Sequence, residues 1–404
     1  MDRKLLEKLK NGELGFHGID GMLGTCDAVE LRRAAVSEMT GIKFDHISKF
    51  SLDIETVTKR NIENMIGAVQ LPLGVAGPLR VNGEYAEGNY YIPLATTEGA
   101  LVASVDRGCS VITACGGANV RIFKDEMTRA PVFRAKDVIG AKRLVEWVSE
   151  PANFLRLKEK AEETTNFGRL LRIEPFVAGK SVFLRFSYDT GDAMGMNMVT
   201  IATDAAVDLI LLENDVELVA LSGNMCSDKK PAGINVVNGR GKSVTSDVIL
   251  KKEVITGKLK TTAGKMIEVN YRKNLIGSAR AVSLGLNAHA ANVAAAMFIA
   301  CGQDAAHVVE ASNAMTTMEP AGAGLYCSVT LPSLAVGTVG GGTRGATQQE
   351  CLGILGVAGS GNPAGANSKK LAEIIAAAVL AGEISLIGAL AARHLAKAHA
   401  ELGR

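Results

Sequence analysis

The chain has 404 residues, of which 47% are hydrophobic and 21% are charged, and its formal net charge is +2. This composition excludes the disordered and fibrous classes and predicts a globular protein with a large core and two or three domains. Because acidic and basic residues nearly balance, we expect no general attraction to nucleic acid or to an anionic membrane. Any anion site must be built locally.

The cysteines and the apolar segments indicate a cytoplasmic protein. The seven cysteines include no Cys-x-x-Cys pair, which is typical of free thiols in a reducing compartment. The first ten residues form a charged amphipathic pattern without the apolar centre of a signal peptide. The uncharged run 321–343 contains Pro332 and many glycines, and the apolar C-terminal helix is interrupted by Glu373 and Glu383, so we expect no membrane span.

Residues 1–50 are expected to form a small helical arm. Asp27 and Glu30 have the spacing of a capping box and predict an amphipathic helix that ends near Gly41. Short extended pieces separated by prolines follow over residues 61–92 and indicate strands and loops.

Residues 131–221 have a regular alternation of predicted strands and helices. Their pattern predicts a βαββαβ order, with strands at 131–135, 170–177, 181–188 and 216–221 and helices at 136–165 and 194–212. This is the order of the ferredoxin-like split βαβ arrangement. We therefore expect a small domain at 131–221, inserted into a large domain made of residues 51–130 and 222–404.

The large domain is expected to surround one buried helix. Residues 277–301 are so rich in alanine and other apolar residues that they predict a helix buried nearly all round, at the centre of the domain. Glycine-rich turns follow over 337–365, and a further helix is predicted over 368–399. The fold class is therefore α+β.

Two carboxylates stand beside small residues in apolar surroundings, where a charge is most costly. Glu98, in Thr96-Thr-Glu-Gly99, precedes an apolar helical stretch, and burial there would favour its protonated form. The alternative is an ordinary carboxylate that complements a helix dipole. Asp304, in Gly302-Gln-Asp304, ends the predicted buried helix and either acts with Glu98 and a lysine or merely ends the helix.

Lys229 is the candidate cation. It lies between Asp228 and Lys230, just before Pro231 in a predicted loop, where one lysine could meet a developing oxyanion. A solvated charge cluster is the competing interpretation. The small and apolar residues on both sides of this cluster argue against it.

Two loops could approach a nucleotide. The string Asp192-Ala-Met-Gly-Met-Asn197 is expected to open a helix, where free N–H groups can bind phosphate, although Asp192 could equally be a simple N-cap. Gly337-Thr-Val-Gly-Gly-Gly-Thr343 is the second loop. Neither has the spacing of a Rossmann fingerprint. His289 shares a helix face with Asn292 and is expected to be a core histidine, and no zinc spacing is present, so no metal is expected.

Taken in order, these strings closely resemble the 3-hydroxy-3-methylglutaryl-coenzyme A reductase family. The resemblance runs from about residue 60 to the end. The sequences of the motifs are similar to those of the class I branch, in a soluble, archaeal-type form. It is carried by Glu63-Asn-Met-Ile-Gly67, Pro72-Leu-Gly-Val-Ala-Gly-Pro-Leu79, Thr96-Thr-Glu-Gly99, Met127-Thr-Arg129, Asp192-Ala-Met-Gly-Met-Asn197, Asp228-Lys-Lys230, Asn287-Ala-His-Ala-Ala-Asn292, Gly302-Gln-Asp304, Gly337-Thr-Val-Gly-Gly-Gly-Thr343 and His399.

The resemblance implies reduction of the acyl-CoA thioester to mevalonate, with two hydrides taken in turn from NADPH. It implies that the large domain binds the acyl-CoA and the small domain binds the nicotinamide nucleotide. It also implies active sites shared across a homodimer, to which residues 63–67 contribute, and dimers that could pair further.

The resemblance also assigns roles to residues. Lys229 would stabilise the oxyanion, Asp304 would tune its neighbours, Glu98 would deliver a proton, and His399 would protonate the departing CoA thiolate. Substrate contacts are implied for Arg129, Ser222, Asp228, Lys230, Lys273, Asn292, Ser104, Arg107 and Lys260. Cofactor contacts are implied for Asp192, Met194, Gly195, Met196, Asn197, Thr165, Asn166, Phe167, Val339, Gly340 and Gly341.

One departure leaves the cofactor open. Where animal members have Ser-Arg-Phe at the 2′-phosphate of the cofactor, this chain has Thr165-Asn-Phe167 and lacks the bidentate cation. NADPH is expected first, with NADH as the alternative. Two other functions compete: an acylating aldehyde dehydrogenase that uses a cysteine thiolate, of which Cys226 is nearest the lysines, and an acyl-CoA sensor without catalysis.

Overall fold

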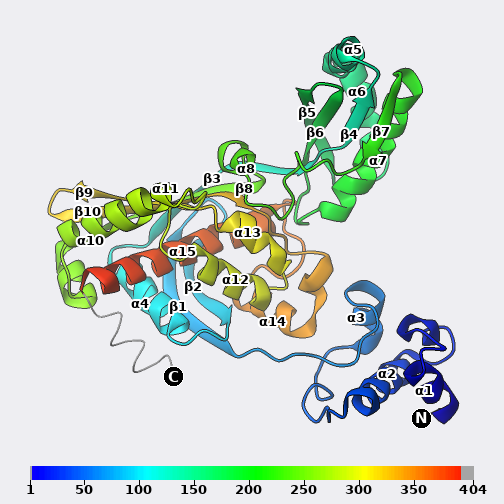
Figure 1. Ribbon diagram of the computed structural model, residues 1–404. Coiled ribbons are helices and arrows are strands. Elements are labelled where there is room, and N and C mark those ends of the chain that lie inside the picture. The colour runs from blue at the N-terminus through cyan, green and yellow to red at the C-terminus, as the bar shows by residue number, and fades with distance from the viewer. Residues whose placement is uncertain (1, 393–404) are drawn as a thin grey trace.

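The computed structural model describes residues 2–392 and shows three regions along the chain (Figure 1). A helical arm comes first, a mixed region of sheet and helices forms the centre, and a smaller unit of strands and helices lies at one end of the long strand β3 (Ala118–Arg129). The predicted mixture of helix and sheet is confirmed.

The N-terminal arm contains the helices α1 (Arg3–Lys10), α2 (Thr25–Thr40) and α3 (Ile54–Arg60), with the short turn η1 (Phe16–Ile19) after α1. The predicted end of α2 is confirmed, because Gly41 follows it with a left-handed φ of 73°. The predicted capping box is wrong. Since α2 already begins at Thr25, Asp27 lies in its first turn, where a carboxylate favours the helix dipole.

The arm has its own small cores. One joins α1 to α2 and contains Leu6, Leu9, Ile19, Ala28, Leu31 and Ala35. In the other, Val57 of α3 packs with Val29 of α2 and with Met65. Within the arm, α2 is therefore tied to α3 and to the segment that follows α3.

The central region is built on one sheet with the strand order β2-β1-β3-β8-β10-β9. All neighbouring strands in it are antiparallel except β1 and β3, which share a short parallel pairing. Besides β3, its strands are β1 (Leu73–Asn82), β2 (Glu87–Ala95), β8 (Gly241–Leu250), β9 (Met315–Ala321) and β10 (Gly324–Leu334).

The helix at the centre of this region is α15 (Ala366–Ala391). Figure 1 shows it between the sheet and the helices α4 (Leu101–Ala114) and α12 (Ala290–Ala300). Nineteen of its 26 residues are buried. By length and composition α15 could cross a membrane, but 83% of its most apolar window is buried inside the protein, as in the core helix of a globular domain.

The predicted position of the central helix is therefore wrong. Residues 277–301 form only the short α11 (Ser278–Arg280), an irregular segment and then α12. The helix is interrupted because Leu286 makes a β-bridge with Met315 and the Asn287 side chain donates to two backbone carbonyls of the same neighbouring segment. Tertiary pairing outweighs the helical propensity of an alanine-rich sequence here.

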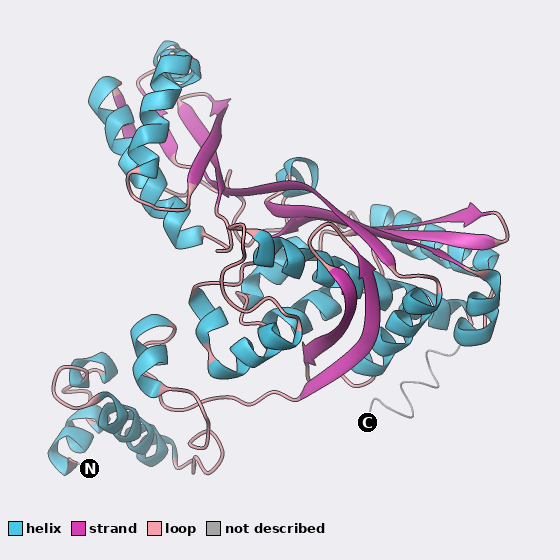
Figure 2. Ribbon diagram, turned by 180° about the vertical axis from the view of Figure 1, so that it is seen from behind, coloured by secondary structure: helices cyan, strands magenta, loops and turns pink. Residues whose placement is uncertain are grey.

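The smaller unit follows the predicted order of elements, and Figure 2 shows its helices against its strands. Its strand order is β7-β4-β6-β5, with every neighbouring pair antiparallel. The elements are β4 (Val132–Ala135), α5 (Val138–Ser149), α6 (Pro151–Glu162), β5 (Arg169–Ala178), β6 (Ser181–Asp189), α7 (Met196–Glu213) and β7 (Val216–Ala220). The helix predicted over 136–165 is two helices, because Pro151 starts a new one.

Strand β3 joins the two regions. Its first part pairs with β8, and its last residues, from Met127 to Arg129, pair with β6 of the smaller unit. The remaining helical segments lie in the central region: α8 (Gly233–Asn238), α9 (Lys252–Val254), η2 (Ile255–Leu259), α10 (Ala263–Val269), η3 (Asn270–Gly277), η4 (Ala305–His307), α13 (Val308–Ala311), η5 (Gly341–Arg344) and α14 (Ala346–Ile354).

Candidate active site

A cavity of about 930 Å³ opens where the smaller unit, the central region and α3 meet. This volume lies in the range of ligand pockets, roughly 300–1,000 Å³. Its walls include many of the residues selected from the sequence: Arg129, Met194, Gly195, Met196, Asn197, Asp228, Lys229, Asp304, Val339, Gly340 and Gly341. Residues of the arm that the sequence did not indicate also line it: Leu52, Val57, Arg60 and Asn61.

The two predicted nucleotide loops lie against each other along this cavity. Ala193 and Val339 form a parallel β-bridge, and Thr338 N–H donates to the Asp192 carbonyl at 2.8 Å. A Cβ at Gly337 would collide with the backbone N of Met194, so only glycine allows this approach. Gly195, with φ 95°, starts α7. Two segments that are distant in the sequence thus place their backbone groups at the same cavity.

Asp192 has another role than the predicted one. Helix α7 begins at Met196, inside the predicted string, and its N-cap is Gly195, so the alternative in which Asp192 caps the helix is wrong. Its carboxylate instead accepts three backbone N–H groups, from Gly361 and Gly365 at 2.8 Å and from Ser368 at 2.9 Å. These donors lie at the start of α15. Asp192 therefore fixes that helix beneath the loops, and its carboxylate is not among the groups that line the cavity.

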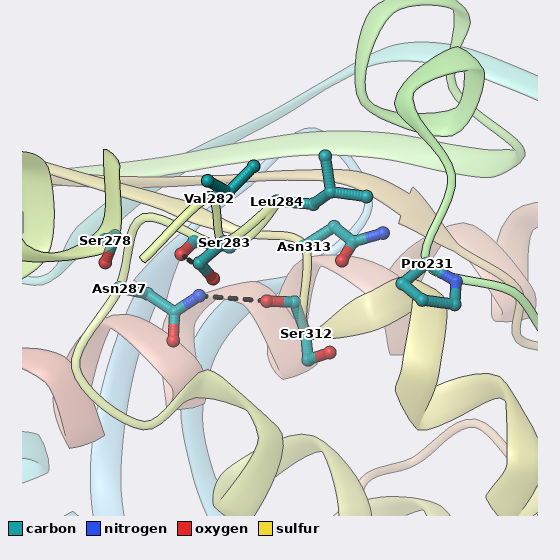
Figure 3. Close-up of a pocket in the computed structure, with 9 residues that line it drawn as sticks. Pro231, Ser278, Val282, Ser283, Leu284, Asn287, Ser312 and Asn313 are labelled. Atoms are coloured by element: carbon teal, nitrogen blue, oxygen red, sulfur yellow. Dashed lines mark hydrogen bonds between the residues drawn. The ribbon is translucent and has the colours of Figure 1, made fainter. Parts of the chain in front are cut away.

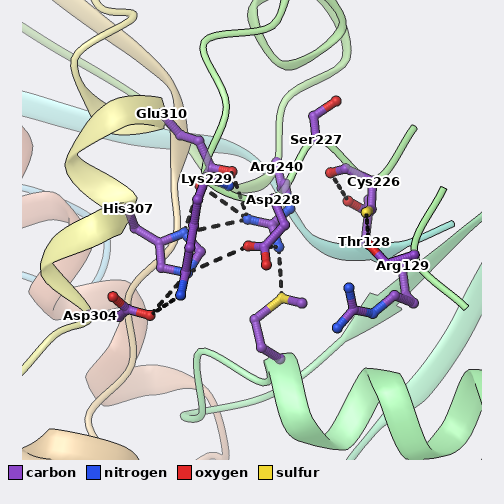
Figure 4. Close-up of polar contacts among 12 residues, drawn as sticks. Thr128, Arg129, Cys226, Ser227, Asp228, Lys229, Arg240, Asp304, His307 and Glu310 are labelled. Carbon is purple, nitrogen blue, oxygen red and sulfur yellow. Dashed lines mark hydrogen bonds and ion pairs between the residues drawn. The ribbon is translucent and has the colours of Figure 1, made fainter. Parts of the chain in front are cut away.

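Lys229 and Asp304 form the ion pair at the cavity wall (Figure 4). Lys229 Nζ lies 2.7 Å from Asp304 Oδ2, and the two side chains remain 41% and 37% exposed. The hydrogen bond to Asp304 raises the pKa of Lys229. Burial by itself would raise the pKa of Asp304, but the bonds from Lys229 and from Ala306 N–H outweigh it and lower that pKa. The lysine is therefore held in its charged form.

Beneath this pair lies a buried network that the sequence analysis missed. Arg240 and Glu310 are both fully buried, and Arg240 Nη1 lies 2.9 Å from Glu310 Oε1. Arg240 Nη2 also lies 3.0 Å from Asp228 Oδ1, and His307 Nδ1 lies 2.7 Å from Glu310 Oε2. The spacing of three residues from Asp304 to His307 and again to Glu310, in an otherwise apolar stretch, is the sequence signal that could have found it.

This network also bears on metal binding. Ligand atoms of Asp228, His307 and Glu310 lie within 4.8 Å of one another. The Arg240 guanidinium already balances both carboxylates, however, which leaves little electrostatic reason for a cation. The expectation of a metal-free site remains a prediction.

Glu98 does not join Lys229 and Asp304 within this chain. Its side chain is exposed rather than buried, because α4 begins only at Leu101, so the predicted burial is wrong. Its one described side-chain contact is with Asn292, whose Nδ2 donates to Glu98 Oε1 at 3.2 Å. Asn292 also lies 3.5 Å from His289, but His289 is the N-cap of α12 and lies outside the helix, so the predicted shared helix face is wrong.

The predicted substrate residues fall into two groups. Those near the lysine loop include Arg129, which donates to Thr200 Oγ1 in the cavity wall, and Lys230, whose Nζ donates to the Asp228 carbonyl at 2.9 Å. Ser222 is exposed and contacts the sulfur of Cys226 at 3.3 Å. The Cys226 thiol is fully buried, which argues against a cysteine nucleophile.

The second group lies away from the large cavity. Arg107 Nε and Ser104 Oγ both contact Ser385 Oγ at 3.0 Å, so in this chain they join α4 to α15. Lys260 is exposed in a left-handed turn, and the exposed Lys273 donates to the Ala288 carbonyl at 3.3 Å. The structure does not bring these four residues to the Lys229–Asp304 pair.

Thr165, Asn166 and Phe167 form the turn between α6 and β5. Thr165 Oγ1 donates to the sulfur of Met198, which lines the cavity, while Asn166 and Phe167 are exposed. Among the described residues, Met198 connects this turn to the cavity. His399, the predicted proton donor to CoA, lies outside the described residues.

A second cavity of about 580 Å³ lies beside Pro231, close to the end of the lysine loop (Figure 3). It is lined by Pro231, which follows Lys230, by Ser278 of α11, and by polar residues of the irregular segment before α12, among them Ser283 and Asn287. The Asn287 side chain donates to the Ser312 carbonyl at 2.9 Å and so shapes this wall.

Comparison with known proteins agrees with the motifs. The family model described as hydroxymethylglutaryl-coenzyme A reductase matches residues 28–404. The 3-hydroxy-3-methylglutaryl-coenzyme A reductase of Methanocaldococcus jannaschii is 54% identical over 99% of this chain and 98% of its own length, and that of Haloferax volcanii is 55% identical over the same shares. A solved class II enzyme from Streptococcus pneumoniae, bound to NADPH, has a TM-score of 0.67 at 19% identity, covering 96% of this chain and 97% of that chain, which is a likeness of fold. Full-length identity of this degree, with the loops and the lysine pair placed around one cavity, assigns the chain to the hydroxymethylglutaryl-coenzyme A reductase family.

Proposed function

We propose that this chain reduces 3-hydroxy-3-methylglutaryl-CoA to mevalonate and free CoA, as a soluble class I enzyme of the cytoplasm. The observation that carries this proposal is the charged Lys229, paired with Asp304 at 2.7 Å, at the wall of a cavity lined by two backbone-rich loops. An ammonium group in that place can donate a hydrogen bond to a carbonyl oxygen as negative charge develops on it.

The reaction needs two reduction steps at one carbon. NADPH, when bound, supplies a hydride to the thioester carbonyl carbon and, after replacement, a second hydride to the resulting aldehyde. Lys229 stabilises the oxyanion at each step, a contribution of the order of 10²- to 10³-fold for one such donor. Asp304 keeps Lys229 charged. Glu98 gives a proton to the alkoxide, and His399 protonates the CoA thiolate as it leaves.

The residues of the two loops fit a nicotinamide nucleotide. Met194 to Asn197 and Val339 to Gly341 offer backbone N–H groups and the start of α7, which favour phosphate oxygens. A Cβ at Gly340 or Gly341 would meet open space on this side, so a ligand can approach the backbone closely. The turn at Thr165 to Phe167 offers no cation of its own for a 2′-phosphate, and NADH remains the alternative.

We also propose that residues 131–221 are a ferredoxin-like unit inserted between the two parts of a large domain, 51–130 and 222–404, after an N-terminal arm at 1–50. The strand order β7-β4-β6-β5 supports this, since it places the first and third strands of the unit side by side at its centre.

A homodimer with shared active sites is proposed because the single chain leaves Glu98 away from Lys229. An exposed apolar stripe next to the residues 63–67 supports it: Val69, Leu71, Leu73 and Val75 are 84%, 40%, 56% and 56% exposed. Alternate residues of an extended segment share one face, so this stripe is a surface that a second copy could cover.

The remaining predicted substrate residues are assigned to this dimer. Arg129, Ser222, Asp228 and Lys230 lie in or beside the lysine loop, whereas Lys273 and Asn292 contact Ala288 and Glu98 in this chain. We propose that all six bind the hydroxymethylglutaryl group in the assembled dimer. Ser104, Arg107 and Lys260 are proposed to bind CoA.

The test mixes the purified protein with 3-hydroxy-3-methylglutaryl-CoA and either NADPH or NADH, while the absorbance of the reduced nicotinamide is followed. We expect two molecules of NADPH to be oxidised for each thioester consumed, with mevalonate and free CoA as products. Thioester binding without oxidation of either nucleotide would contradict the proposal and favour an acyl-CoA sensor.

A further inference from the structure

The turn that carries Lys229 is strained. Asn224, Ser227 and Lys229 have left-handed φ angles of 64°, 55° and 57°. Side chains other than glycine disfavour this region, so such a turn persists only where surrounding contacts impose it. Those contacts decide where Lys229 Nζ points.

The contact on Lys229 itself comes from a carboxylate outside the cavity wall. Glu310 of α13 is fully buried, and its Oε1 accepts Lys229 N–H at 2.8 Å. Glu310 is in turn fixed by Arg240 Nη1, at 2.9 and 3.0 Å from its two oxygens, and by His307 Nδ1 at 2.7 Å. A carboxylate bonded on this many sides has little freedom to follow a relaxing turn.

Arg240 extends this arrangement to the neighbouring parts of the cavity. Its Nη2 lies 3.0 Å from Asp228 Oδ1 and 2.7 Å from the sulfur of Met196, the first residue of α7. One buried guanidinium therefore touches the residue before Lys229 and the start of the helix at the nucleotide loop (Figure 4 shows the arginine among its carboxylates).

We propose that Glu310 is a positioning residue, which with Arg240 holds the turn of Lys229 in its strained form and so keeps Nζ at Asp304. This inference rests on the proposed function, in which Lys229 acts on the carbonyl oxygen. Without the Glu310 carboxylate the turn can relax toward ordinary φ values, and the ammonium group leaves the place where the oxyanion forms.

The test compares E310Q with E373Q in the full-length protein. Glu373 is the matched control because it is also fully buried and accepts three backbone N–H groups, but it lines neither cavity. For E310Q we expect kcat per folded protein to fall about 10- to 100-fold, with KM for both substrates within about twofold of wild type, because a small misplacement of a catalytic group acts on the chemical step.

A second measurement separates positioning from simple destabilisation. With NADPH deuterated at the transferred position, the isotope effect on kcat should increase in E310Q, since hydride transfer then limits the rate. E373Q should lower the melting temperature but leave kcat and the isotope effect of the folded protein unchanged. If E310Q does not fold because Arg240 loses its counter-charge, E310D keeps that charge, shortens the side chain and should show the same fall in kcat.

The outcomes distinguish the two proposals. E310Q or E310D with wild-type kcat and isotope effect would overturn the positioning role while leaving the reductase function intact. A wild-type protein that oxidises no nicotinamide with the thioester would instead overturn the function.

Discussion

The buried acids of α15 and the acids at the cavity differ in what they bind. Glu373 accepts N–H groups from residues 84, 85 and 86, and Glu383 accepts those of Ala288 and His289 and the Thr316 hydroxyl, so both are saturated by the fold. Asp304 is partly exposed and meets Lys229. The buried acids of α15 thus have an architectural role, whereas the proposed catalytic charges, Lys229 and Asp304, lie at the accessible wall of the large cavity.

The sequence pattern places these acids the other way round. Glu373 and Glu383 interrupt an apolar helical pattern, and the residues around Glu98 predict a buried carboxylate. The structure reverses these positions: Glu98 is exposed, and the two acids of α15 are fully buried. An apolar neighbourhood in sequence therefore does not by itself locate a reactive carboxylate.

The largest effect is expected on stability, from Glu383→Ala. It leaves two backbone N–H groups and one hydroxyl without an acceptor in the core. We expect the free energy of unfolding to fall by about 4 kcal/mol, measured by urea denaturation. Glu55→Ala, on an exposed helix pair with Lys59, should leave the free energy of unfolding nearly unchanged. Equal losses in the two variants would contradict the architectural role.

Lys229→Ala should show the opposite pattern. Because the side chain is 41% exposed, its loss should leave the melting temperature nearly unchanged, while kcat falls about 100- to 1,000-fold as the oxyanion loses its donor. Steady-state kinetics beside a thermal melt measure both. Lys258→Ala, which removes another exposed lysine, should retain full activity. Normal turnover by Lys229→Ala would remove the central residue of the proposed mechanism.

Gly337→Ala should have a smaller effect, confined to the nucleotide. The added Cβ would collide with Met194 N and push the two loops apart, so KM for NADPH should rise about tenfold with a smaller change for the thioester. Gly353→Ala is the control, because the added Cβ would meet open space on α14. This variant should have an unchanged KM for NADPH and a slightly more stable helix. A similar KM in both variants would show that close approach of the loops is not needed.

The smallest effect concerns pH. Asp304 has a lowered pKa, so its contribution to stability is present above its unfolded value of about 3.9 and is lost as the pH falls further. Lys229 has a raised pKa, so its contribution is present below about 10.4 and is lost above it. Asp304→Asn should therefore lower the free energy of unfolding by less than about 1 kcal/mol, because the pair is partly exposed. This loss should be the same at every pH between about 5 and 9.

Urea denaturation of wild type and Asp304→Asn at several pH values measures this difference. It should shrink as the pH falls below about 3.9 and through the lowered pKa of the folded state, where the wild-type aspartate also becomes protonated. A difference that grows on acidification would mean that Asp304 is stabilised in its neutral form, contrary to the ion pair.

The sequence by itself determined the local elements and the motifs. Strands β5 and β6 and the helix α7 lie within two residues of their predicted bounds, because alternating or helical patterns act over a few residues. The family could also be recognised from the sequence, because its motifs are short and occur in a fixed order along the chain. The motifs even selected Lys229 and Asp304, which the fold then brought to 2.7 Å.

Only the tertiary structure decided which distant groups meet. It interrupted the predicted central helix, because Leu286 pairs with Met315 just before α12, and it placed α15 at the centre instead. It placed Asp192 on the start of α15, and it brought Glu310 to the backbone of Lys229 across 81 residues. Such contacts depend on the close packing of whole elements, where a buried polar group must find a partner wherever the fold supplies one, and no local pattern encodes that partner.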